Sequence, residues 1–542
     1  TQHRSTAIVF DEFENESNLP TIFGIEMVRH WLLVLLAILL IAFLAKLYCD
    51  TRNVEKDKPL WKYYIRQSVS LLVLVPIAIA CMRGTFFNTA TRPISISNAL
   101  QYVNRPVETG IVLNTPFALL RTLNQKNIRV PRYFTNPTEL DSLYSPVHQP
   151  IDSTVVQKKN IVILIIESFA QEFVGALNKD LDNGQYRGYT SFTDSLLHHC
   201  LYYEESFSNS GFSIDAMPAV FSSIPRMNKP FVLTPFSLNR LTSLPGVLKD
   251  WGYTTAFFHG AANGSMGFQA YARTAGFSNY YGRTEYNKDP RFNGDKDYDG
   301  TWAIWDEPFL QYYCLEMSDM KEPFMTAVFT ATSHHPFAIP EQYKDVFKDE
   351  GIYPLHKCIR YTDHALRQFF ATAKQQPWYE NTLFVITADH ASSRITHDEY
   401  KTDIGIFRIP ILFFDPAGKM PTGCHKGIAQ QIDIMPTLLG YLGYDKPYIA
   451  FGQDLLRTDP ADMWAFNWDH IPQFIKNNYL LQSDNETITG IYDYRSDPLL
   501  KKNLKGELPE EKAMERQMKA IIQSFMERME ADSVTISPKM NQ

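Results

Sequence analysis

The stretch N-T-L-F-V-I-T-A-D-H, residues 381–390, decides how the rest of the chain is interpreted. Its centre, residues 383–386, is a short apolar run of the kind found in a strand that is buried on both faces of a parallel sheet. The run ends at Asp389 and His390. Ligands of open α/β sheets bind beyond the carboxyl ends of the strands, so this carboxylate and imidazole form half of a potential divalent metal site. For an isolated Asp-His pair, a capping aspartate and a surface histidine would be the simpler interpretation.

Other apolar runs repeat this pattern along the chain. Strand-like runs cover residues 161–166, 254–258, 324–330 and 410–414. Helical stretches, such as 360–374 and 433–442, separate them. This alternation predicts a three-layer α/β domain with a mostly parallel sheet.

Length, charge and cysteine content limit the possible classes of protein. The chain has 542 residues, which favours about two to four structural units. Its net charge is -7 and it contains no long block of Lys and Arg, so nucleic-acid binding is not expected. The six cysteines show no zinc-ligand spacing, and pairing among the last four is left open; they are residues 49, 81, 200, 314, 358 and 424.

Two apolar segments near the N-terminus predict a membrane anchor. The first, residues 31–45, has apolar neighbours that extend it to the ~20 residues of a spanning helix. The second, residues 69–82, contains Pro76 and is long enough only if it extends to Phe86 and Phe87. A signal peptide fits neither this position nor the polar residues before it, whereas two buried core helices remain an alternative. Because the chain begins with Thr1, further spanning helices before it are left open.

The loop between the two apolar segments is basic. It carries Arg52, Lys56, Lys58, Lys62 and Arg66. The positive-inside rule places this loop in the cytoplasm, so the chain after about residue 84 is expected on the other side of the membrane. The prediction is a multi-pass membrane protein with an exported soluble domain.

These patterns divide the chain into four parts. Residues 1–83 form a membrane region with two spanning helices, and 84–158 form an arm and linker with short helical stretches at 97–103 and 116–124. Residues 159–460 form the α/β catalytic domain. Residues 461–542 form a C-terminal subdomain with hairpin-like segments, a charged helix at 507–530 and a disordered end.

Four strand ends carry side chains that suit metal and phosphate chemistry. Glu167 follows the run at 161–166, and a carboxylate in such a place needs a metal, an arginine or a helix end as its partner. His259 ends a second strand, and His334 follows a third. Each residue alone has a simpler interpretation, but together with Asp389 and His390 they favour a functional site.

Ser213 adds a possible nucleophile to these strand ends. Gly211 allows a tight turn before it, and a helix with an apolar face follows. A serine that merely caps this helix is the common case. The functional alternative is a serine nucleophile at a helix N-terminus, where backbone amides favour a phosphate.

In its motifs and their order, the sequence resembles the lipoteichoic acid synthase group of membrane phosphoglycerol transferases, within the alkaline phosphatase/sulfatase superfamily. The first motifs are I-V-I-L-I-I-E-S at 161–168, the turn at Ser213, F-H-G at 258–260, H-H-P-F at 334–337 and A-D-H at 388–390. The later motifs are R-I-P-I-L-F-F-D-P at 408–416, Q-I-D-I-M-P-T-L-L at 431–439 and F-G-Q-D-L-L at 451–456. The resemblance extends over residues 24–500.

The resemblance implies roles for individual residues. One divalent metal would be bound by Glu167, Ser213, Asp389 and His390, and Ser213 would be the nucleophile where relatives often have Thr. Mn²⁺ is the expected ion, with Zn²⁺ and Mg²⁺ as alternatives. His259 and His334 would be catalytic and would contact the phosphate, with His334 as general acid and then base.

The resemblance also implies a reaction and a place in the cell. Ser213 would take a phosphoglycerol head group from a phospholipid such as phosphatidylglycerol, and an acceptor hydroxyl would then receive it. The acceptor could be a glycan, a lipid or a glycerol phosphate chain. The protein would lie in the bacterial inner membrane with its catalytic domain on the periplasmic or extracellular side. Phosphoethanolamine transfer, phosphodiester hydrolysis and a non-catalytic binding role remain alternatives.

The sequence departs from this family after F-H-G. Synthases have an Asp and a W-x-R there, whereas residues 261–268 read A-A-N-G-S-M-G-F, which leaves the head group open. Asn263 in this segment is the predicted substrate contact. Phe212 replaces the Lys expected before the nucleophile. Residues 213–217 lack the Pro and Arg of a sulfatase core, so hydrolysis of sulfate esters is not expected.

Overall fold

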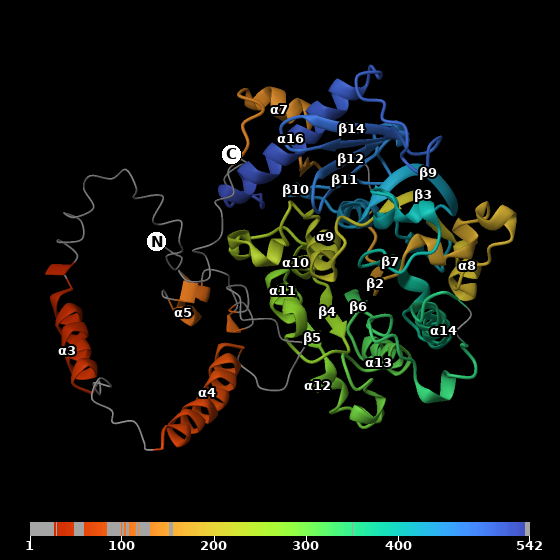
Figure 1. Cartoon of the computed structure of the whole chain (residues 1–542). Helices are drawn as coiled ribbons and strands as arrows, with labels where there is room; N and C mark the ends of the chain where they lie inside the picture. The colour runs from red at the N-terminus through yellow and green to blue at the C-terminus, as the bar shows by residue number, and fades with distance from the viewer. Residues whose placement is uncertain are drawn as a thin grey trace. The chain divides into compact units, whose positions relative to one another are not determined.

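The computed structural model describes residues 27–28, 30–47, 59–83, 99, 102–103, 108–114, 117–118, 130–150, 156–348 and 351–536 (Figure 1). The chain forms two compact units. The first consists of residues 1–96 and 109–128, and the second of residues 97–108 and 129–542. The four-part division predicted from the sequence therefore stays a prediction.

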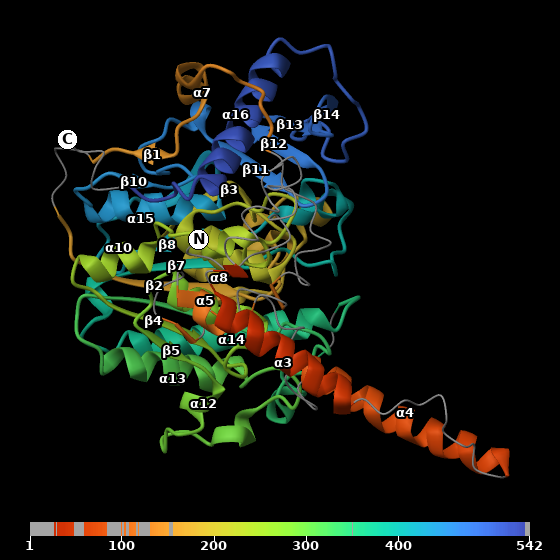
Figure 2. The same ribbon diagram turned by 90° about the vertical axis from the view of Figure 1, so that its left-hand side faces the viewer.

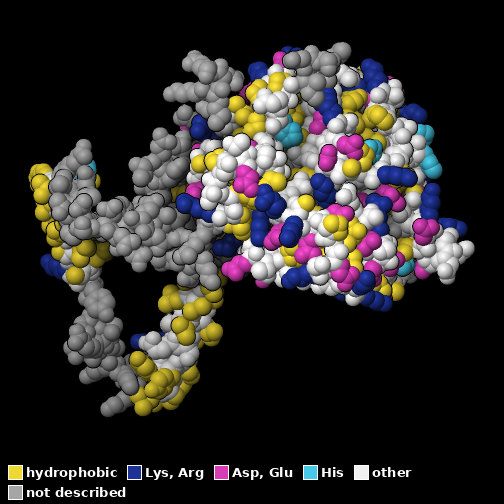
Figure 3. All heavy atoms as spheres, turned by 90° about the horizontal axis from the view of Figure 1, so that it is seen from above, with side chains coloured by type: hydrophobic (Ala, Val, Ile, Leu, Met, Phe, Trp, Pro, Cys, Tyr) yellow, Lys and Arg dark blue, Asp and Glu magenta, His cyan; other side chains and the backbone are white. Residues whose placement is uncertain are grey.

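The first unit contains apolar helices. They are α3 (Trp31–Leu47), α4 (Leu60–Arg83) and the short α5 (Thr109–Val112). Among the described residues, Leu60–Ala80 is the one helix that is long and apolar enough to cross a membrane, and only 6% of its most apolar window is buried. Figure 3 shows hydrophobic side chains over the surface of α3 and α4.

The relative lengths of the two apolar segments differ from the sequence prediction. The second segment forms the longer helix because it extends backwards to Leu60, through Trp61 and Ile65. Most of its side chains are exposed within the first unit, unlike those of a buried core helix. Phe86, Phe87, most of the basic loop and most of the stretches at 97–103 and 116–124 lie outside the described residues.

The second unit is built on an eight-stranded sheet in the order β5-β4-β6-β2-β7-β8-β3-β9. The bounds are β2 (Asn160–Ile166), β3 (Cys200–Phe207), β4 (Thr254–His259), β5 (Asn279–Tyr281), β6 (Phe324–Phe329), β7 (Thr382–Ala388), β8 (Ile411–Phe414) and β9 (Gly423–Gln430). β8 is antiparallel to both of its neighbours, and the other pairs in the sheet are parallel.

The register of the central strands positions the candidate site. Every residue of β2, β6 and β7 is buried, as their continuous apolar sequences require. Ile166 pairs with Ala388, and His259 pairs with Phe329, so four parallel strands end at the same edge of the sheet. Glu167, His259 and Asp389 therefore lie along this edge.

Helices cover both faces of the sheet, which confirms the predicted three-layer fold. Figure 2 shows α10 (Leu244–Asp250) and α15 (Ile434–Leu442) on one face, and α13 (Asp306–Ser318) and α14 (Leu355–Ala373) on the other. The remaining helices of this region are α8 (Ser191–Leu197), α9 (Ala216–Ser222), α11 (Phe268–Thr274) and α12 (Arg283–Tyr286). Cys200 and Cys314 are free and buried in this unit, and Cys424 is free and exposed.

The C-terminal part adds a second sheet. Its four antiparallel strands are β11 (Trp464–Trp468), β12 (Pro472–Lys476), β13 (Tyr479–Ser483) and β14 (Ile488–Asp493), followed by helix α16 (Glu511–Glu530). Residues 130–150, which the sequence placed in a linker, contribute α7 (Pro137–Leu143) and strand β1 (Val147–His148), which pairs with β10 (Tyr448–Ile449). Gln523 of α16 exchanges hydrogen bonds with the main chain of Phe134.

Candidate metal centre

Three possible metal ligands converge beyond the ends of β2 and β7. One ligand atom from each of Glu167, Asp389 and His390 lies within 4.8 Å of the others. The Ser213 hydroxyl lies 3.2 Å from His390 Nε2 and 3.4 Å from Glu167 Oε2. The structure thus brings together the four residues that the sequence analysis assigned to a metal.

The turn after β2 ties Glu167 to the end of β7. Ser168 has a φ of 55°, a left-handed conformation that is uncommon outside glycine and often marks functional sites. Its amide donates to Asp389 Oδ1 at 2.7 Å, and its hydroxyl donates to Glu167 Oε1 at 2.7 Å. The Glu167 amide donates to Thr330 Oγ1 at 3.1 Å. These bonds fix both carboxylates before any ion binds.

The orientation of His390 leaves one ring nitrogen available. Its Nδ1 lies 2.6 Å from the Ala391 carbonyl oxygen, which can only accept, so Nδ1 carries the hydrogen. Nε2 then presents its lone pair towards Ser213 and towards Asp389 Oδ2, 3.2 Å away. A histidine held by a carbonyl in this way is a frequent metal ligand.

The electrostatics of the centre favour a bound cation. Burial, together with the nearby Glu167 carboxylate, raises the pKa of Asp389 to about 7. No full hydrogen bond reaches Asp389 Oδ2 from the described residues, although the Ser213 hydroxyl lowers its pKa to some extent. Burial lowers the pKa of His390, but the two carboxylates outweigh this effect and raise it. Two close carboxylates and a free imidazole nitrogen fit a divalent ion with oxygen and nitrogen ligands.

Ser213 does not act as a helix cap. It is the first residue of the 3-10 turn η7 (Ser213–Asp215), which leads into α9, and the N-cap residues of these two elements are Phe212 and Asp215. The Ser213 hydroxyl instead faces Glu167 and His390. Its hydroxyl is therefore available to the metal centre. The functional interpretation of this serine fits the structure better than the capping interpretation.

A buried arginine supports the Ser213 turn, and the sequence analysis missed it. Arg226 Nη1 donates to Asp215 Oδ2 at 2.7 Å, and its Nε lies 3.0 Å from Asp469 Oδ1. Its guanidinium also lies 4.8 Å from the centre of the Phe212 ring. Asp469 follows β11, so this ion-pair network connects the C-terminal sheet with the residues on both sides of Ser213.

Gln431 connects the serine loop with the end of β7. Its Nε2 donates to the carbonyls of Ala388 and Asp389, both at 2.8 Å, and its Oε1 accepts the Asn209 amide at 2.9 Å. This is a structural reason for the glutamine at the start of Q-I-D-I-M-P.

The other predicted site residues have different surroundings. His259 is buried, and its Nδ1 lies 3.0 Å from the Phe329 carbonyl oxygen. Burial lowers the pKa of His259, and the hydrogen bond to the Phe329 carbonyl and then the Glu167 carboxylate partly offset this. A neutral ring with its hydrogen on Nδ1 leaves Nε2 as an acceptor. His334 Nδ1 faces the His335 carbonyl oxygen at 3.1 Å. Their catalytic and binding roles remain predictions.

Asn263 is engaged with a neighbouring turn. Its side chain donates to Glu285 Oε2 at 2.9 Å and accepts from the Thr284 amide at 3.3 Å. Substrate contact by Asn263 stays a prediction that would require these bonds to open.

A tryptophan does stand near His334, although the motif after F-H-G lacks one. The Trp302 ring centre lies 4.3 Å from that of His334, and Trp302 Nε1 donates to the His335 carbonyl at 2.7 Å. A β-bridge between Ala261 and Ala303 brings this segment to the F-H-G loop. Sequence spacing gave no signal for Trp302 because the contact depends on this bridge.

Residues 159–444, more than half of the chain, match the family model described as sulfatase. The chain belongs to the sulfatase family. Members of this family and of the alkaline phosphatase superfamily are metal-dependent enzymes, which agrees with the four residues gathered at the strand ends.

Curated relatives of this sulfatase-family chain include two lipoteichoic acid synthases. Lipoteichoic acid synthase 2 of Bacillus subtilis is 26% identical over 372 residues, which cover 64% of this chain and 55% of the relative. The lipoteichoic acid synthase of Staphylococcus aureus is 25% identical over 367 residues, covering 62% and 54%. The chain thus spans about half the length of these relatives, and the predicted family resemblance is confirmed.

Solved structures show the same fold. A protein of the alkaline phosphatase superfamily from Vibrio parahaemolyticus has a TM-score of 0.61 at 22% identity, covering 74% of this chain and 98% of its own. The lipoteichoic acid synthase LtaP of Listeria monocytogenes has a TM-score of 0.60 at 20% identity, covering 72% and 98%. The predicted sulfatase-like α/β fold is therefore confirmed.

Proposed function

We propose that this protein is a membrane-anchored, metal-dependent transferase that moves a phosphoglycerol head group from a phospholipid to an acceptor hydroxyl. The observation that carries the proposal is the approach of the Ser213 hydroxyl to Glu167 and His390 beside the unpartnered Asp389 Oδ2. The lipoteichoic acid synthase relatives support phosphoglycerol as the transferred group.

Glu167, Asp389 and His390, with Ser213 beside them, would hold the divalent ion, for which Mn²⁺ is proposed and Zn²⁺ or Mg²⁺ are alternatives. A bound ion would supply Lewis acidity to the phosphoryl group and lower the pKa of the serine hydroxyl. The buried carboxylates and the carbonyl-held imidazole set these ligands in place before substrate arrives.

The transfer takes place in two steps. Ser213 Oγ passes its proton towards Glu167 Oε2 and attacks phosphorus, while the bond from phosphorus to the diacylglycerol oxygen breaks. His334 protonates the departing diacylglycerol. His334 then deprotonates the acceptor hydroxyl, which attacks phosphorus while the bond from phosphorus to Ser213 Oγ breaks. Glu167 returns the proton to Ser213 Oγ, which restores the free hydroxyl. His259 lies beside the phosphate, and its Nε2 accepts a hydrogen bond from a hydroxyl of the head group.

Phosphoethanolamine transfer and phosphodiester hydrolysis use the same centre and remain rivals. An ethanolamine head group would need an acidic contact for its ammonium. The acidic groups that flank the Ser213 turn, Asp215 and Asp469, are both paired with Arg226, so phosphoglycerol is the first choice. Residues 213–217 lack the Pro and Arg of a sulfatase core, so sulfate-ester hydrolysis is not proposed.

A lipid donor would explain why the chain carries apolar helices in its first unit, since they would hold the enzyme at the membrane. α4 is long enough to span a membrane, and α3 is a shorter apolar helix. The proposed location is the bacterial inner membrane, with the second unit on the periplasmic or extracellular side. The acceptor is a glycan, a lipid or a glycerol phosphate chain.

The proposal is tested with the purified full chain in detergent and fluorescent phosphatidylglycerol. We expect release of diacylglycerol that requires Mn²⁺, is abolished by Ser213→Ala and is unchanged by Ser142→Ala on the exposed face of α7. If phosphatidylethanolamine were the better donor, the transferred group would be phosphoethanolamine and not phosphoglycerol. Equal release by wild type and Ser213→Ala would overturn the mechanism.

A further inference from the structure

A polar cavity of about 400 Å³ lies in the second unit, apart from the metal ligands. Its walls come from the 3-10 segments η4 (Gln171–Phe173), η6 (Leu181–Gly184) and η14 (Asp398–Lys401), from β3 and from the chain after β14. Ile404 and Arg408, on either side of η15 (Gly405–Phe407), complete them. A volume of this size falls in the range of small-molecule sites, roughly 300–1,000 Å³.

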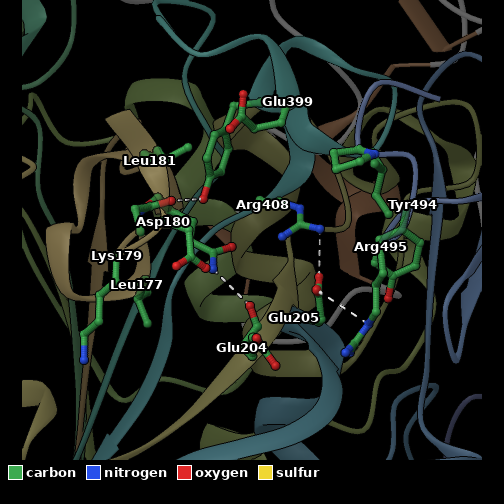
Figure 4. A pocket seen from close by; sticks show the side chains of 15 residues that line it. Leu177, Lys179, Asp180, Leu181, Glu204, Glu205, Glu399, Arg408, Tyr494 and Arg495 are labelled. Carbon is green, nitrogen blue, oxygen red and sulfur yellow. Dashed lines mark hydrogen bonds and ion pairs between the residues drawn. The ribbon is translucent and has the colours of Figure 1, made fainter. Parts of the chain in front are cut away.

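A buried carboxylate between two arginines lines this cavity. Glu205 Oε2 lies 2.9 Å from Arg408 Nη2, and Glu205 Oε1 lies 3.9 Å from Arg495 Nε. Figure 4 shows Glu205 between the two guanidinium groups. The Arg408 guanidinium also lies 5.7 Å from the ring centre of Tyr494, so this cation is held from two sides. The arrangement presents fixed guanidinium donors in the cavity.

The wall also contains an acceptor without a partner. Gln171 is only 2% exposed, and its Nε2 donates to the Glu204 carbonyl at 3.0 Å. Its Oε1 meets no hydrogen-bond donor in the part of the chain that the structure describes. A buried amide oxygen left in this state costs free energy unless a ligand or water supplies a hydrogen.

The charges of the lining nearly cancel. Four carboxylates and three cations line the cavity: Asp180, Glu204, Glu205, Glu399, Lys179, Arg408 and Arg495. The rim acids oppose a strongly anionic ligand, and the two arginines oppose a cationic one. Planar carboxylate, guanidinium and amide groups instead match pairs of neighbouring hydroxyls, because they offer two acceptors or two donors side by side. A neutral ligand rich in hydroxyls fits this lining best.

The cavity is connected to the metal centre by the chain and by a hydrogen bond. Gln171 follows Glu167 by four residues, and its amide donates to the Arg408 carbonyl at 3.0 Å. Glu205 lies near the end of β3, and the chain that leaves this strand leads to Ser213. We propose that the cavity binds a neutral sugar unit of the acceptor, an assignment that rests on the proposed transferase function.

Saturation-transfer NMR on the full chain tests this assignment. The probes are the neutral disaccharides maltose and gentiobiose, with glycerol 3-phosphate as anion and ethanolamine as cation, in a detergent without sugar groups. EDTA is present and lipid is absent, so the measurement is independent of catalysis. We expect saturation transfer to at least one disaccharide. Arg495→Ala and Glu399→Gln should each weaken the affinity for it about tenfold, the effect of losing one hydrogen bond to a charged group.

The matched control is Arg240→Ala, an arginine that is 75% exposed and paired only at the surface with Asp532. It should bind the disaccharide as wild type does. Two results would overturn the proposal: no transfer to either disaccharide, or binding of glycerol 3-phosphate that Arg495→Ala removes, which would make this an anion site. Sugar binding without lipid-dependent transfer would overturn the proposed function and leave the sugar site standing.

Discussion

At the scale of single residues, Arg226 combines a structural and a positioning role. It is buried and carries the counter-charge for Asp215, two residues after Ser213, and for Asp469 beyond β11. Burial raises the pKa of Asp215, whereas the Arg226 guanidinium lowers it and keeps the carboxylate compatible with this dry position. Loss of Arg226 would leave two acids without their cation next to the nucleophile.

Arg226→Ala is expected to lower the free energy of unfolding by about 3–5 kcal/mol, because removing one partner leaves buried charges uncompensated. Arg226→Lys keeps the charge but loses the planar fork, so it should be more stable than Arg226→Ala and still slow kcat by moving the Ser213 turn. Urea unfolding and diacylglycerol release measure the two effects. Arg240→Ala is the surface control, expected within about 0.5 kcal/mol of wild type. A lysine variant with wild-type kcat would contradict the positioning role.

The sequence predicts part of this site and leaves part of it hidden. Glu167, Asp389 and His390 follow buried strands, and the common edge of a parallel sheet is enough to bring them together. Arg226 and Trp302 could not be predicted in this way. Their contacts depend on the C-terminal sheet and on a bridge between distant loops, which local pattern and spacing do not encode.

At the scale of elements, the loop after β7 is anchored by one buried acid of η4. Glu172 Oε1 accepts the Thr396 and His397 amides at 3.0 and 2.8 Å and lies 2.6 Å from His397 Nδ1. Burial lowers the pKa of His397, but Glu172 and then Asp182 outweigh this and raise it. These contacts therefore favour the protonated form of His397, and that form stabilises the loop, which begins at the metal ligands.

The raised pKa of His397 predicts how the stability of the loop depends on pH. A histidine whose folded pKa is raised contributes stability that is complete below its ordinary pKa of about 6.5 and is lost as pH rises through the folded value. The difference in unfolding free energy between wild type and His397→Gln should therefore be larger at pH 6 than at pH 9. Urea unfolding measures it, with exposed His199→Gln as a control. A difference that is constant with pH would contradict the charged pair.

The accuracy of prediction also differs between elements. β2, β4, β6, β7 and β8 were predicted because each carries an apolar run, which a strand that is buried on both faces requires. β3 and β9 read C-L-Y-Y-E-E-S-F and G-C-H-K-G-I-A-Q, and their polar residues resemble loops. β3 tolerates Glu205 because Arg408 and Arg495 pair with it, and that pairing is long-range.

At the scale of the whole molecule, the two units have contrasting surfaces. α3 and α4 expose apolar side chains along their lengths, as a lipid environment favours. On the second unit, Figure 3 shows acidic and basic side chains interspersed, which is typical of a surface in water. This contrast is what the proposed membrane anchor and water-exposed second unit require.

The side of the membrane can be tested with Cys424. This thiol is exposed, whereas Cys200, Cys314 and Cys358 are buried. In a background with Cys49→Ser and Cys81→Ser, a membrane-impermeant maleimide added to intact spheroplasts should label the protein, and Cys424→Ser should abolish the label. Because partial burial raises the pKa of this thiol, the labelling is done at about pH 8. Labelling only after lysis would place the second unit in the cytoplasm.

The proposed mechanism requires that Ser213 carries the head group during transfer. Intact mass spectrometry of the full chain, after incubation with phosphatidylglycerol and Mn²⁺ without acceptor, measures this most directly. We expect an added glycerol phosphate on wild type, located at Ser213 by peptide mapping, and no adduct on Ser213→Ala or on wild type in EDTA. A wild-type protein that binds Mn²⁺ and releases diacylglycerol, yet never carries an adduct, would contradict the covalent mechanism and indicate direct hydrolysis.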